Sequence, residues 1–389
     1  MTCALIDTIP RWSGGYLAHL KGILSGSSVP EDMHVVVHGT SELRNAIGPA
    51  DGRVDFIVDD AMPMNPVLLR LWRSTKLPGI VSSLSPDVLF SPAGDFGGRH
   101  RAGLTKITMC HNLQPYIQTE RKRVPLYRFG RLRLEALHRA LNATFERADG
   151  VIFLSEHARE VVLGERVNVR QSAVIPHGIS DVFRRRPEQK PLPREPVLLY
   201  VSDFHEYKHQ WSVVRAVALL RKETGMPLTL HLVGQMSPQG RRVFEPVVEE
   251  LGNPGWLRVT NYVPHAEMPA VYREADAFIF ASTVETFGIV LLEAMASGLP
   301  IACSNRCPMT DMLGDNGGIF FEPEDPSSIA STVRRLLEDD ELRYRCALNA
   351  YNRALAYSWE RTARETYGFI RDVVSSRAVR RGEGSQPRA

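Results

Sequence analysis

The sequence is poor in cysteine, and its few cysteines form no recognisable pattern. There are five, an odd number scattered along the chain: Cys3, Cys110, Cys303, Cys307 and Cys346. Cys303 and Cys307 are four residues apart, but no second pair stands near them in sequence to complete a zinc site. We therefore expect isolated, reduced thiols, as in a cytosolic protein, and neither disulfides nor a bound metal.

Long apolar segments and a strong net charge are also absent. No stretch approaches the roughly 18–20 consecutive apolar residues that a membrane-spanning helix needs. The first residues, MTCALIDTIP, lack the basic stretch and long apolar core of a signal peptide. The formal net charge is only +3, which gives no global case for nucleic-acid binding. We expect a cytoplasmic globular protein with no nucleic-acid partner, whose basic features are local.

Two common nucleotide-binding motifs are missing as well. Neither a G-x-G-x-x-G fingerprint nor a P-loop follows any of the expected strands. This absence argues against a nicotinamide-dependent dehydrogenase and against a P-loop ATPase.

What the sequence does contain is a repeated alternation of short apolar runs and longer amphipathic segments. At 389 residues the chain is long enough for two domains. Strands that alternate with helices predict parallel sheets with helices on both faces, so the fold class is α/β with two doubly wound domains. The expected strands are 3–7, 33–38, 54–58, 87–91, 105–110 and 150–154, then 197–201, 228–234, 256–260, 276–281 and 299–304.

A proline-rich, charged segment between these two series predicts the domain boundary. The segment DVFRRRPEQKPLPREP, 181–196, interrupts the alternation and is typical of a linker. We expect one domain over 1–180 and a second over 197–357. A C-terminal helix over 358–375 is then expected to pack back on the first domain, followed by a flexible polar tail over 376–389.

Doubly wound domains bind ligands at the carboxyl ends of their strands. The loop after the first expected strand holds Gly14 and Gly15 directly before a helix. Paired glycines let a backbone come close to a ligand, and the start of a helix favours anions. A plain tight turn explains the same two glycines equally well.

The stretch ETFGIVLLEAMASGLP, 285–300, is apolar almost without a break, yet it carries Glu285 before Gly288 and Glu293 inside the expected helix. At about 1.5 Å per residue, Glu293 lies roughly 7–8 Å along the helix from its start. Between the carboxylates lie the free N–H groups of residues 287–289. Carboxylates accept hydrogen bonds from hydroxyl groups and a helix start favours phosphates, an order that matches a hexose, a diphosphate and a ribose. The alternative is a helix-start acid followed by an exposed glutamate.

This stretch resembles the E-x7-E signature of retaining GT-B glycosyltransferases, above all glycosyltransferase family 4 (glycosyl transferases group 1). Other segments that resemble the family follow in order over nearly the whole chain: the early GG loop, CHN, ADGVIFLSEHAR, VIPHGIS, YVSDFHEYKH, LVG, NYVPHAEMPAVYREADAFIFAS and YSWERTARETY. Each is loose alone, and together they are specific. The resemblance implies two Rossmann-like domains that face each other across a cleft, the first for the acceptor and the second for the donor nucleotide.

The resemblance also implies roles for four residues of the second domain. Glu285 matches the glutamate that binds hydroxyl groups of the donor sugar, and Glu293 matches the one that binds the ribose. Phe287 and Gly288 are expected to contact the donor through their backbones.

One position departs from the family pattern. Members usually carry an arginine and a lysine after the first strand of the second domain, both in contact with the donor diphosphate. Lys208 matches the lysine, but Asp203 stands where the arginine is expected. Because an aspartate cannot neutralise phosphate, Lys208, the Gly14–Gly15 amides and the helix dipole must suffice, or His205 or His209 must help. An ordinary helix-start lysine is the alternative for Lys208.

Two histidines stand out. His111 follows the expected strand 105–110, so it lies at a carboxyl edge. A lone histidine in such a place is usually structural, but the resemblance implies a role near the transferred sugar. His111 and Glu285 are therefore the candidate catalytic residues. For His177, in the segment IPHG, we expect a structural role.

The implied reaction moves a hexose from a nucleotide-diphosphate sugar, GDP-mannose or a UDP-hexose, to a saccharide or lipid-linked acceptor, with retention of configuration. The implied pathway is the synthesis of bacterial cell-surface polysaccharide or lipopolysaccharide. No Asp-x-Asp motif of the metal-binding kind occurs, so we expect no cofactor and no required metal. A sugar-nucleotide epimerase of the same fold and a catalytically silent nucleotide-sugar binding module remain alternatives.

A local basic segment, RKRVPLYRFGRLRLEALHRA at 121–140, bears on the acceptor. The segment contains a single acid, Glu135. Its cations are Arg121, Lys122, Arg123, Arg128, Arg131, Arg133 and Arg139. The simpler interpretation is a solvated basic face of a first-domain helix. The other is peripheral docking to anionic lipid on the inner face of the cell membrane, where each cation is worth about 1 kcal/mol.

Overall fold

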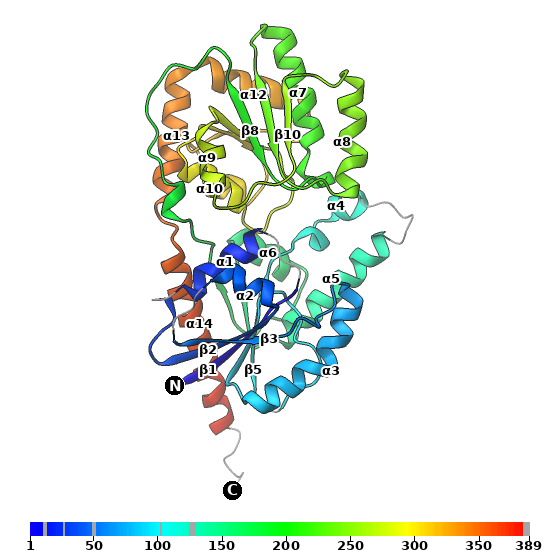
Figure 1. The fold of residues 1–389 in the computed structure, drawn as a ribbon, viewed down its shortest axis with the longest axis vertical. Coiled ribbons are helices and arrows are strands. Elements are labelled where there is room, and N and C mark those ends of the chain that lie inside the picture. Colours follow the sequence, from blue (N-terminus) through cyan, green and yellow to red (C-terminus); the bar gives the residue numbers. More distant parts are fainter. Residues whose placement is uncertain (11–13, 26–27, 49–51, 102, 124–129, 384–389) are drawn as a thin grey trace. The chain divides into compact units, whose positions relative to one another are not determined.

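The structure is a computed structural model that describes residues 1–10, 14–25, 28–48, 52–101, 103–123 and 130–383. The chain divides into two compact units. The first comprises residues 1–178 together with the segment from 358 onward, and the second comprises residues 179–357. Each unit contains one parallel sheet with helices packed around it (Figure 1).

The first unit is built on a sheet of seven parallel strands in the order β3-β2-β1-β4-β5-β6-β7. The strands are β1 (Thr2–Asp7), β2 (Met33–Gly39), β3 (Val54–Val58), β4 (Val88–Ser91), β5 (Thr105–Cys110), β6 (Gly150–Phe153) and β7 (Ser172–Val174). The strand order reverses between β1 and β4, which makes this pair the switch point of the sheet.

The helices of the first unit come from both ends of the chain. They are α1 (Gly14–Leu24), α2 (Ser41–Ile47), α3 (Pro66–Leu84), α4 (Gln118–Arg123), α5 (Gly130–Arg147), α6 (Glu156–Gly164) and α14 (Trp359–Glu383). Helix α14 packs closely against α1. The Tyr367 hydroxyl donates to the Ile23 carbonyl at 2.8 Å, and a Cβ at Gly22 would lie 2.2 Å from the Trp359 ring. Gly22 is therefore required by the close approach of these two helices.

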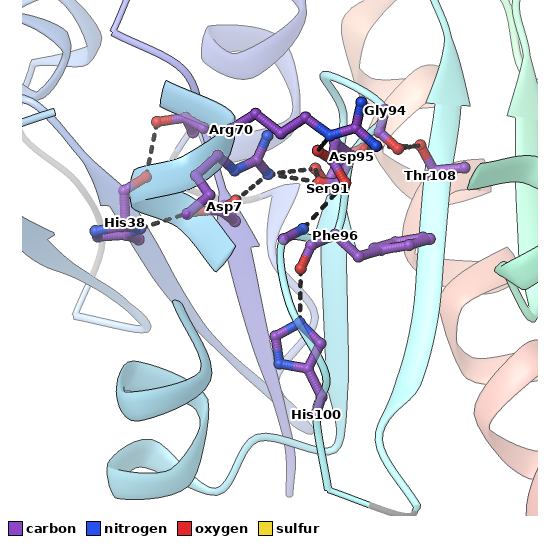
Figure 2. Close-up of polar contacts among 12 residues, drawn as sticks. Asp7, His38, Arg70, Ser91, Gly94, Asp95, Phe96, His100 and Thr108 are labelled. Atoms are coloured by element: carbon purple, nitrogen blue, oxygen red, sulfur yellow. Dashed lines mark hydrogen bonds and ion pairs between the residues drawn. The ribbon is translucent and has the colours of Figure 1, made fainter. Parts of the chain in front are cut away.

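The first switch point is closed by a buried polar network (Figure 2). Asp7, the last residue of β1, accepts from His38 Nδ1 at 2.7 Å and is ion-paired with Arg73 of α3. Arg73 also donates to Ser91 Oγ at 2.9 Å and to the Asp95 carbonyl at 2.6 Å. Asp7 is 0% exposed and Arg73 4% exposed. Burial alone would raise the pKa of Asp7, but the Arg73 charge and the His38 contact outweigh burial and lower it.

The second unit is built on six parallel strands in the order β10-β9-β8-β11-β12-β13. The strands are β8 (Val197–Val201), β9 (Thr229–Val233), β10 (Leu257–Thr260), β11 (Ala277–Phe280), β12 (Ile301–Ser304) and β13 (Ile319–Phe321). All residues of β11 and β12 are buried, as expected of parallel strands covered on both faces. The switch point of this sheet lies between β8 and β11.

The helices of the second unit pack on both sides of its sheet. They are α7 (Gln210–Thr224), α8 (Pro238–Glu250), α9 (Met268–Arg273), α10 (Ile289–Ala296), α11 (Met309–Leu313), α12 (Pro326–Glu338) and α13 (Asp340–Ala354). The α/β class with two doubly wound sheets is thus confirmed, and every strand expected from the sequence is present to within about two residues.

Some elements of the structure differ from the sequence prediction. The short strands β7 and β13 were not predicted, because three residues are too few to show a period. Helix α14 continues to Glu383, beyond the predicted helix end at 375. A polar composition does not oppose a helix when the residues include good helix formers such as alanine and arginine. The predicted linker residues 184–196 form neither helix nor strand, and they belong to the second unit.

Candidate functional site

Lys208 and Glu285 lie together at the switch point of the second sheet. Lys208 ends the 3₁₀ turn Glu206–Lys208 that follows β8, and Glu285 lies in the loop between β11 and α10. Although the two residues are 77 apart in sequence, Lys208 Nζ and Glu285 Oε1 form an ion pair. The side chains are 11% and 14% exposed, so the pair is mostly but not completely removed from solvent.

The surroundings of Lys208 keep it charged. Burial disfavours the ammonium, but the negative charge of Glu285 outweighs burial, and the pKa of Lys208 is raised. The ammonium also lies 5.3 Å from the centre of the Tyr207 ring and 5.5 Å from that of Phe280. A fixed cation at a carboxyl edge is suited to binding phosphate.

Helix α10 begins a few residues after Glu285, at Ile289. Gly288 adopts a φ of +100°, in the left-handed region. A Cβ there would find its nearest neighbour at 3.7 Å, an ordinary contact, so the backbone conformation and not the space requires glycine. Phe287 is buried, and its ring lies 5.7 Å from that of Tyr357. The N–H groups of the first turn, such as that of Ile289, have no acceptor within the helix.

Glu293 is buried inside α10 and is only 4% exposed, so the alternative of an exposed helical glutamate is wrong. Its Oε2 accepts from the Tyr272 hydroxyl at 2.8 Å, and its Oε1 lies 3.1 Å from His265 Nε2. Tyr272 is completely buried on α9, and the His265 ring lies 5.4 Å from that of Phe183. These contacts fix the orientation of the carboxylate.

Sequence reasoning did not identify Tyr272 or His265. Both occur in the segment NYVPHAEMPAVYREADAFIFAS, which was noticed only as a family landmark. The pairing with Glu293 depends on how α9 packs on α10, and no local pattern encodes that.

Asp203, which replaces the expected arginine, has a structural partner. Its Oδ1 accepts from the backbone N–H of Gln235 at 2.9 Å, which ties the loop after β8 to the loop after β9. Of the two histidines considered as substitutes for the arginine, His205 gives little positive charge. Burial, together with Lys208, lowers the pKa of His205, and His209 is completely buried at the start of α7, with its Nε2 3.4 Å from Thr283 Oγ1.

In the first unit, the sequence predicted that Gly14 and Gly15 lie in a loop, and this prediction is wrong. Helix α1 begins at Gly14, so both glycines belong to its first turn. The error arises because glycine is a poor helix former, although it is tolerated in a first turn where the N–H groups have no helical partner. Ser13, the residue before them, lies outside the described residues.

His111 follows β5, and three aromatic side chains surround it. Its ring centre lies 5.8 Å from Tyr16, 5.9 Å from His19 and 6.0 Å from His177. Burial lowers the pKa of His111 to about 4 and that of His19 to about 3, and it holds the pKa of His177 well below its ordinary value. At neutral pH these are therefore uncharged imidazoles, which can exchange hydrogen bonds but do not supply positive charge.

The basic segment 121–140 is partly neutralised. Arg121 and Arg139 are ion-paired with Glu135, and Arg123 lies 3.2 Å from Glu120, an acid just outside the segment. Arg131 donates to the Lys122 carbonyl at 2.8 Å. Arg128 lies outside the described residues.

Two cations of this segment remain exposed without a carboxylate partner in the described part of the chain, Lys122 on α4 and Arg133 on α5. Leu132 and Leu137 are exposed on α5, whereas Leu134 and Phe145 are buried in the unit. Helix α5 therefore buries one apolar side and presents exposed leucines beside exposed cations on another.

Within the described ranges, no group of three or more histidine, cysteine or acidic side chains is arranged to hold a metal ion. Nor does any described helix combine the length and the apolar character needed to span a bilayer.

Two family models match the chain. Residues 182–353 match the model of glycosyl transferases group 1, and residues 32–182 match that of glycosyltransferase family 4. The two matches together run from residue 32 to residue 353, and the chain belongs to this family of glycosyltransferases.

Relatives of known activity align with about half of the chain. The O-antigen chain mannosyltransferase B of Escherichia coli is 31% identical over 168 residues, which cover 43% of this chain and 44% of the relative. A D-inositol 3-phosphate glycosyltransferase of Frankia alni is 31% identical over 190 residues, 47% of each chain. The match thus spans less than half the length of each of these relatives.

Solved structures share the fold over nearly the whole chain. HepE of Anabaena in complex with UDP and glucose superposes with a TM-score of 0.71 at 15% identity, covering 95% of this chain and 99% of that one. WaaG, a glycosyltransferase involved in lipopolysaccharide biosynthesis, gives 0.70 at 17% identity, with coverages of 95% and 99%. These similarities establish the GT-B fold.

Proposed function

We propose that the chain transfers a hexose from a nucleotide-diphosphate sugar to a saccharide or lipid-linked acceptor, with retention of configuration. The observation that carries this proposal is the group of residues at the second switch point. A paired cation and carboxylate, Lys208 and Glu285, stand before the helix start at Gly288, and a buried carboxylate, Glu293, lies within that helix.

Each part of a donor has a partner of matching chemistry in this group. The Glu293 carboxylate, held by Tyr272, is suited to accept hydrogen bonds from the two hydroxyl groups of a ribose. The N–H groups at the start of α10 and the Lys208 ammonium suit the diphosphate. When a phosphate oxygen replaces Glu285 as the partner of Lys208, the Glu285 carboxylate becomes free to accept hydrogen bonds from the sugar hydroxyls.

The proposed mechanism needs no protein nucleophile. The departing phosphate accepts the proton of the acceptor hydroxyl while the new bond forms on the same face of the sugar. The protein positions the reactants and stabilises charge, and the raised pKa of Lys208 keeps a full positive charge beside the leaving diphosphate. We place His111 near the transferred sugar as a neutral hydrogen-bonding group.

The names of the relatives narrow the donor and the acceptor. One relative is an O-antigen chain mannosyltransferase, which favours GDP-mannose, and HepE has been solved with UDP-glucose, which favours a UDP-hexose. The O-antigen relative and WaaG both point to cell-surface saccharides as acceptors. We therefore propose a role in bacterial polysaccharide or lipopolysaccharide synthesis.

The test is a screen of UDP-, GDP- and ADP-sugars with and without saccharide acceptors. A transferase releases nucleotide and lengthens the acceptor, an epimerase isomerises the sugar, and a silent binding module only gains stability. A donor at 100 times its dissociation constant should add about 2.7 kcal/mol to the free energy of unfolding. A Glu285→Gln variant that retained full transfer would contradict the proposed site.

We further propose that the first unit docks on anionic lipid through the exposed cations Lys122 and Arg133 and the exposed Leu132 and Leu137. The test is sedimentation with anionic vesicles, which should carry wild-type protein down at low salt and release it near 1 M salt, where the screening length is about 3 Å. Lys122/Arg133→Gln should stay in the supernatant, whereas Arg194/Arg334→Gln, an exposed pair elsewhere, should pellet. If wild type stays in solution, a soluble acceptor becomes the better proposal.

A further inference from the structure

A hollow lies in the second unit at the amino-terminal edge of its sheet, opposite the edge that carries Lys208 and Glu285. It is bounded by the residues just before β11 and β12, by the segment 185–190 and by one side of α13. Its volume is about 70 Å³. Since a water molecule needs roughly 10–15 Å³ by this measure, the hollow has room for several waters or one small anion.

The lining is rich in positive charge. Five cations oppose three carboxylates: Arg185, Arg186, Lys190, Arg273 and Arg343 against Glu188, Asp276 and Asp340. Two of these cations are paired with carboxylates of the same lining: Lys190 lies 3.9 Å from Asp276, and Arg343 is ion-paired with Asp340. Arg343 also donates to the Leu337 and Lys190 carbonyls, so it is a structural anchor.

Three guanidinium groups are left over. Arg185, Arg186 and Arg273 are exposed and have no carboxylate partner in the described part of the chain. Only Glu188 among the lining carboxylates remains to offset them. A rim with this excess of arginine favours a ligand with several negative oxygens, because guanidinium binds such oxygens two at a time.

Ser297 gives an independent indication of a ligand. It lines the hollow and is only 7% exposed, yet its hydroxyl has no hydrogen-bond partner among the described residues. A buried hydroxyl without a partner is costly, so a hydrogen-bonding group in the hollow would stabilise it.

The carbonyl groups at the end of α10 are already bonded, which weakens their repulsion of an anion here. The carbonyls of residues 293–296 accept from the N–H groups of Ser297, Leu299, Gly298 and Arg185, at distances from 2.9 to 3.2 Å. Gly298 has a φ of +69°, and a Cβ there would lie 2.4 Å from the Arg185 carbonyl oxygen. The backbone of Arg185 is thus fixed against the end of α10, with its side chain at the rim.

We propose that this hollow binds a small phosphate-containing anion, phosphate or pyrophosphate, held by Arg185, Arg273 and Ser297. Two of the rim arginines, Arg185 and Arg186, belong to the irregular segment 184–196 that precedes β8. An occupied site therefore ties that segment to α9 and α10, and it is distinct from the proposed donor site at the other edge of the sheet.

The test is a calorimetric titration of inorganic pyrophosphate into the full chain at constant ionic strength. A Lys208→Ala background removes the main cation of the proposed donor site, so that the remaining heat reports on the hollow. Arg185/Arg273→Gln should weaken this binding about tenfold or more, and Ser297→Ala about threefold. The control double variant Arg194/Arg334→Gln removes two exposed arginines outside the hollow and should leave binding unchanged. Thermal unfolding checks that every variant is folded.

A parallel arm replaces pyrophosphate with vesicles of phosphatidylcholine and phosphatidic acid, to separate a free anion from a lipid headgroup. In this arm the chain also carries Lys122/Arg133→Gln, which removes the lipid-docking cations proposed for the first unit. Binding in either arm that Arg185/Arg273→Gln abolishes supports the site, and the arm identifies the source of the phosphate. The proposal is overturned if neither probe binds in the Lys208→Ala background, or if Arg185/Arg273→Gln binds as well as its parent. It is also overturned if the control double variant loses binding to the same extent.

Discussion

The switch points of the two sheets each hold a cation paired with a carboxylate, but the two pairs differ in access to solvent. In the first unit Asp7 and Arg73 are buried, and His38 and Ser91 form further hydrogen bonds with them. In the second unit Lys208 and Glu285 retain partial exposure, and an open helix start follows them. A pair that is enclosed in the core cannot reach a ligand, whereas a partly exposed pair can exchange its internal contact for one.

The two units also differ in the charge of the remaining groups at their carboxyl edges. The first unit presents neutral imidazoles, His19, His111 and His177, whose pKa values are lowered by burial. The second presents the charged Lys208 and the carboxylates Glu285 and Glu293. This division suits a transferase in which the second unit holds an anionic nucleotide and the first a neutral acceptor.

The largest effect should come from acid. The folded pKa of His19 is about 3 against an ordinary value near 6.5, so between these values the unfolded chain binds more protons, and stability falls as the pH drops through this window. For His19 alone the loss is roughly 5 kcal/mol at the acid end. Hydrogen exchange at decreasing pH should therefore show the first unit losing protection before the second. Simultaneous loss of protection in both units would show that the buried histidines do not make the first unit more sensitive to acid.

Breaking the two ion pairs should separate their roles. Arg73→Met leaves a buried carboxylate without its cation and should cost about 3–5 kcal/mol of stability. Lys208→Met should cost less stability, because Glu285 can reach water, but it should weaken donor binding strongly. Chemical denaturation and nucleotide binding measured on both variants check this. The same loss of stability in both, with donor binding intact, would show that the two pairs are equivalent.

Glu285 and Glu293 should respond differently to truncation. Glu285→Ala should lower turnover about 100-fold, if its hydrogen bonds to the sugar strengthen as charge develops on the ring. Glu293→Ala should weaken donor binding more than Glu285→Ala does, because a ribose contact is equal in ground and transition states. Steady-state kinetics with the donor found in the screen distinguish these outcomes. Equal and mild effects from both changes would rule out the donor site.

Tyr272→Phe should have a moderate effect, since it removes one hydrogen bond from a buried carboxylate that keeps its other contact with His265. We expect about a tenfold loss of nucleotide affinity. Tyr351→Phe is the matched control, because no partner of the Tyr351 hydroxyl is found in the described part of the chain, and it should bind nucleotide as wild type does. If both variants bind equally well, Tyr272 does not orient Glu293.

The smallest effect should come from chelation. If Lys208 and the start of α10 supply the positive charge for the diphosphate, transfer should continue unchanged in excess EDTA. Loss of activity that magnesium or manganese restores would show that a metal ion, and not the protein alone, neutralises the donor.

The sequence was sufficient to place a residue in the fold where a local pattern and the strand order determine its position. Glu285, Gly288 and Glu293 could be placed because one apolar stretch follows a recognisable strand. The contacts between distant segments could not be placed. Arg73 meets Asp7 across 66 residues and Tyr272 meets Glu293 across 21, and both pairings depend on how a helix packs on its neighbours. The helical start at Gly14 was missed because glycine is a poor helix former, although a first turn tolerates it.

The measurement that tests the central claim most directly is the affinity for UDP and GDP, without a sugar, of wild type, Glu293→Gln and His111→Asn. If the second unit binds the nucleotide, Glu293→Gln should weaken the preferred nucleotide about tenfold or more, and His111→Asn should bind it as wild type does. A loss of affinity in His111→Asn with none in Glu293→Gln would contradict the account, because it would place the nucleotide at the first unit.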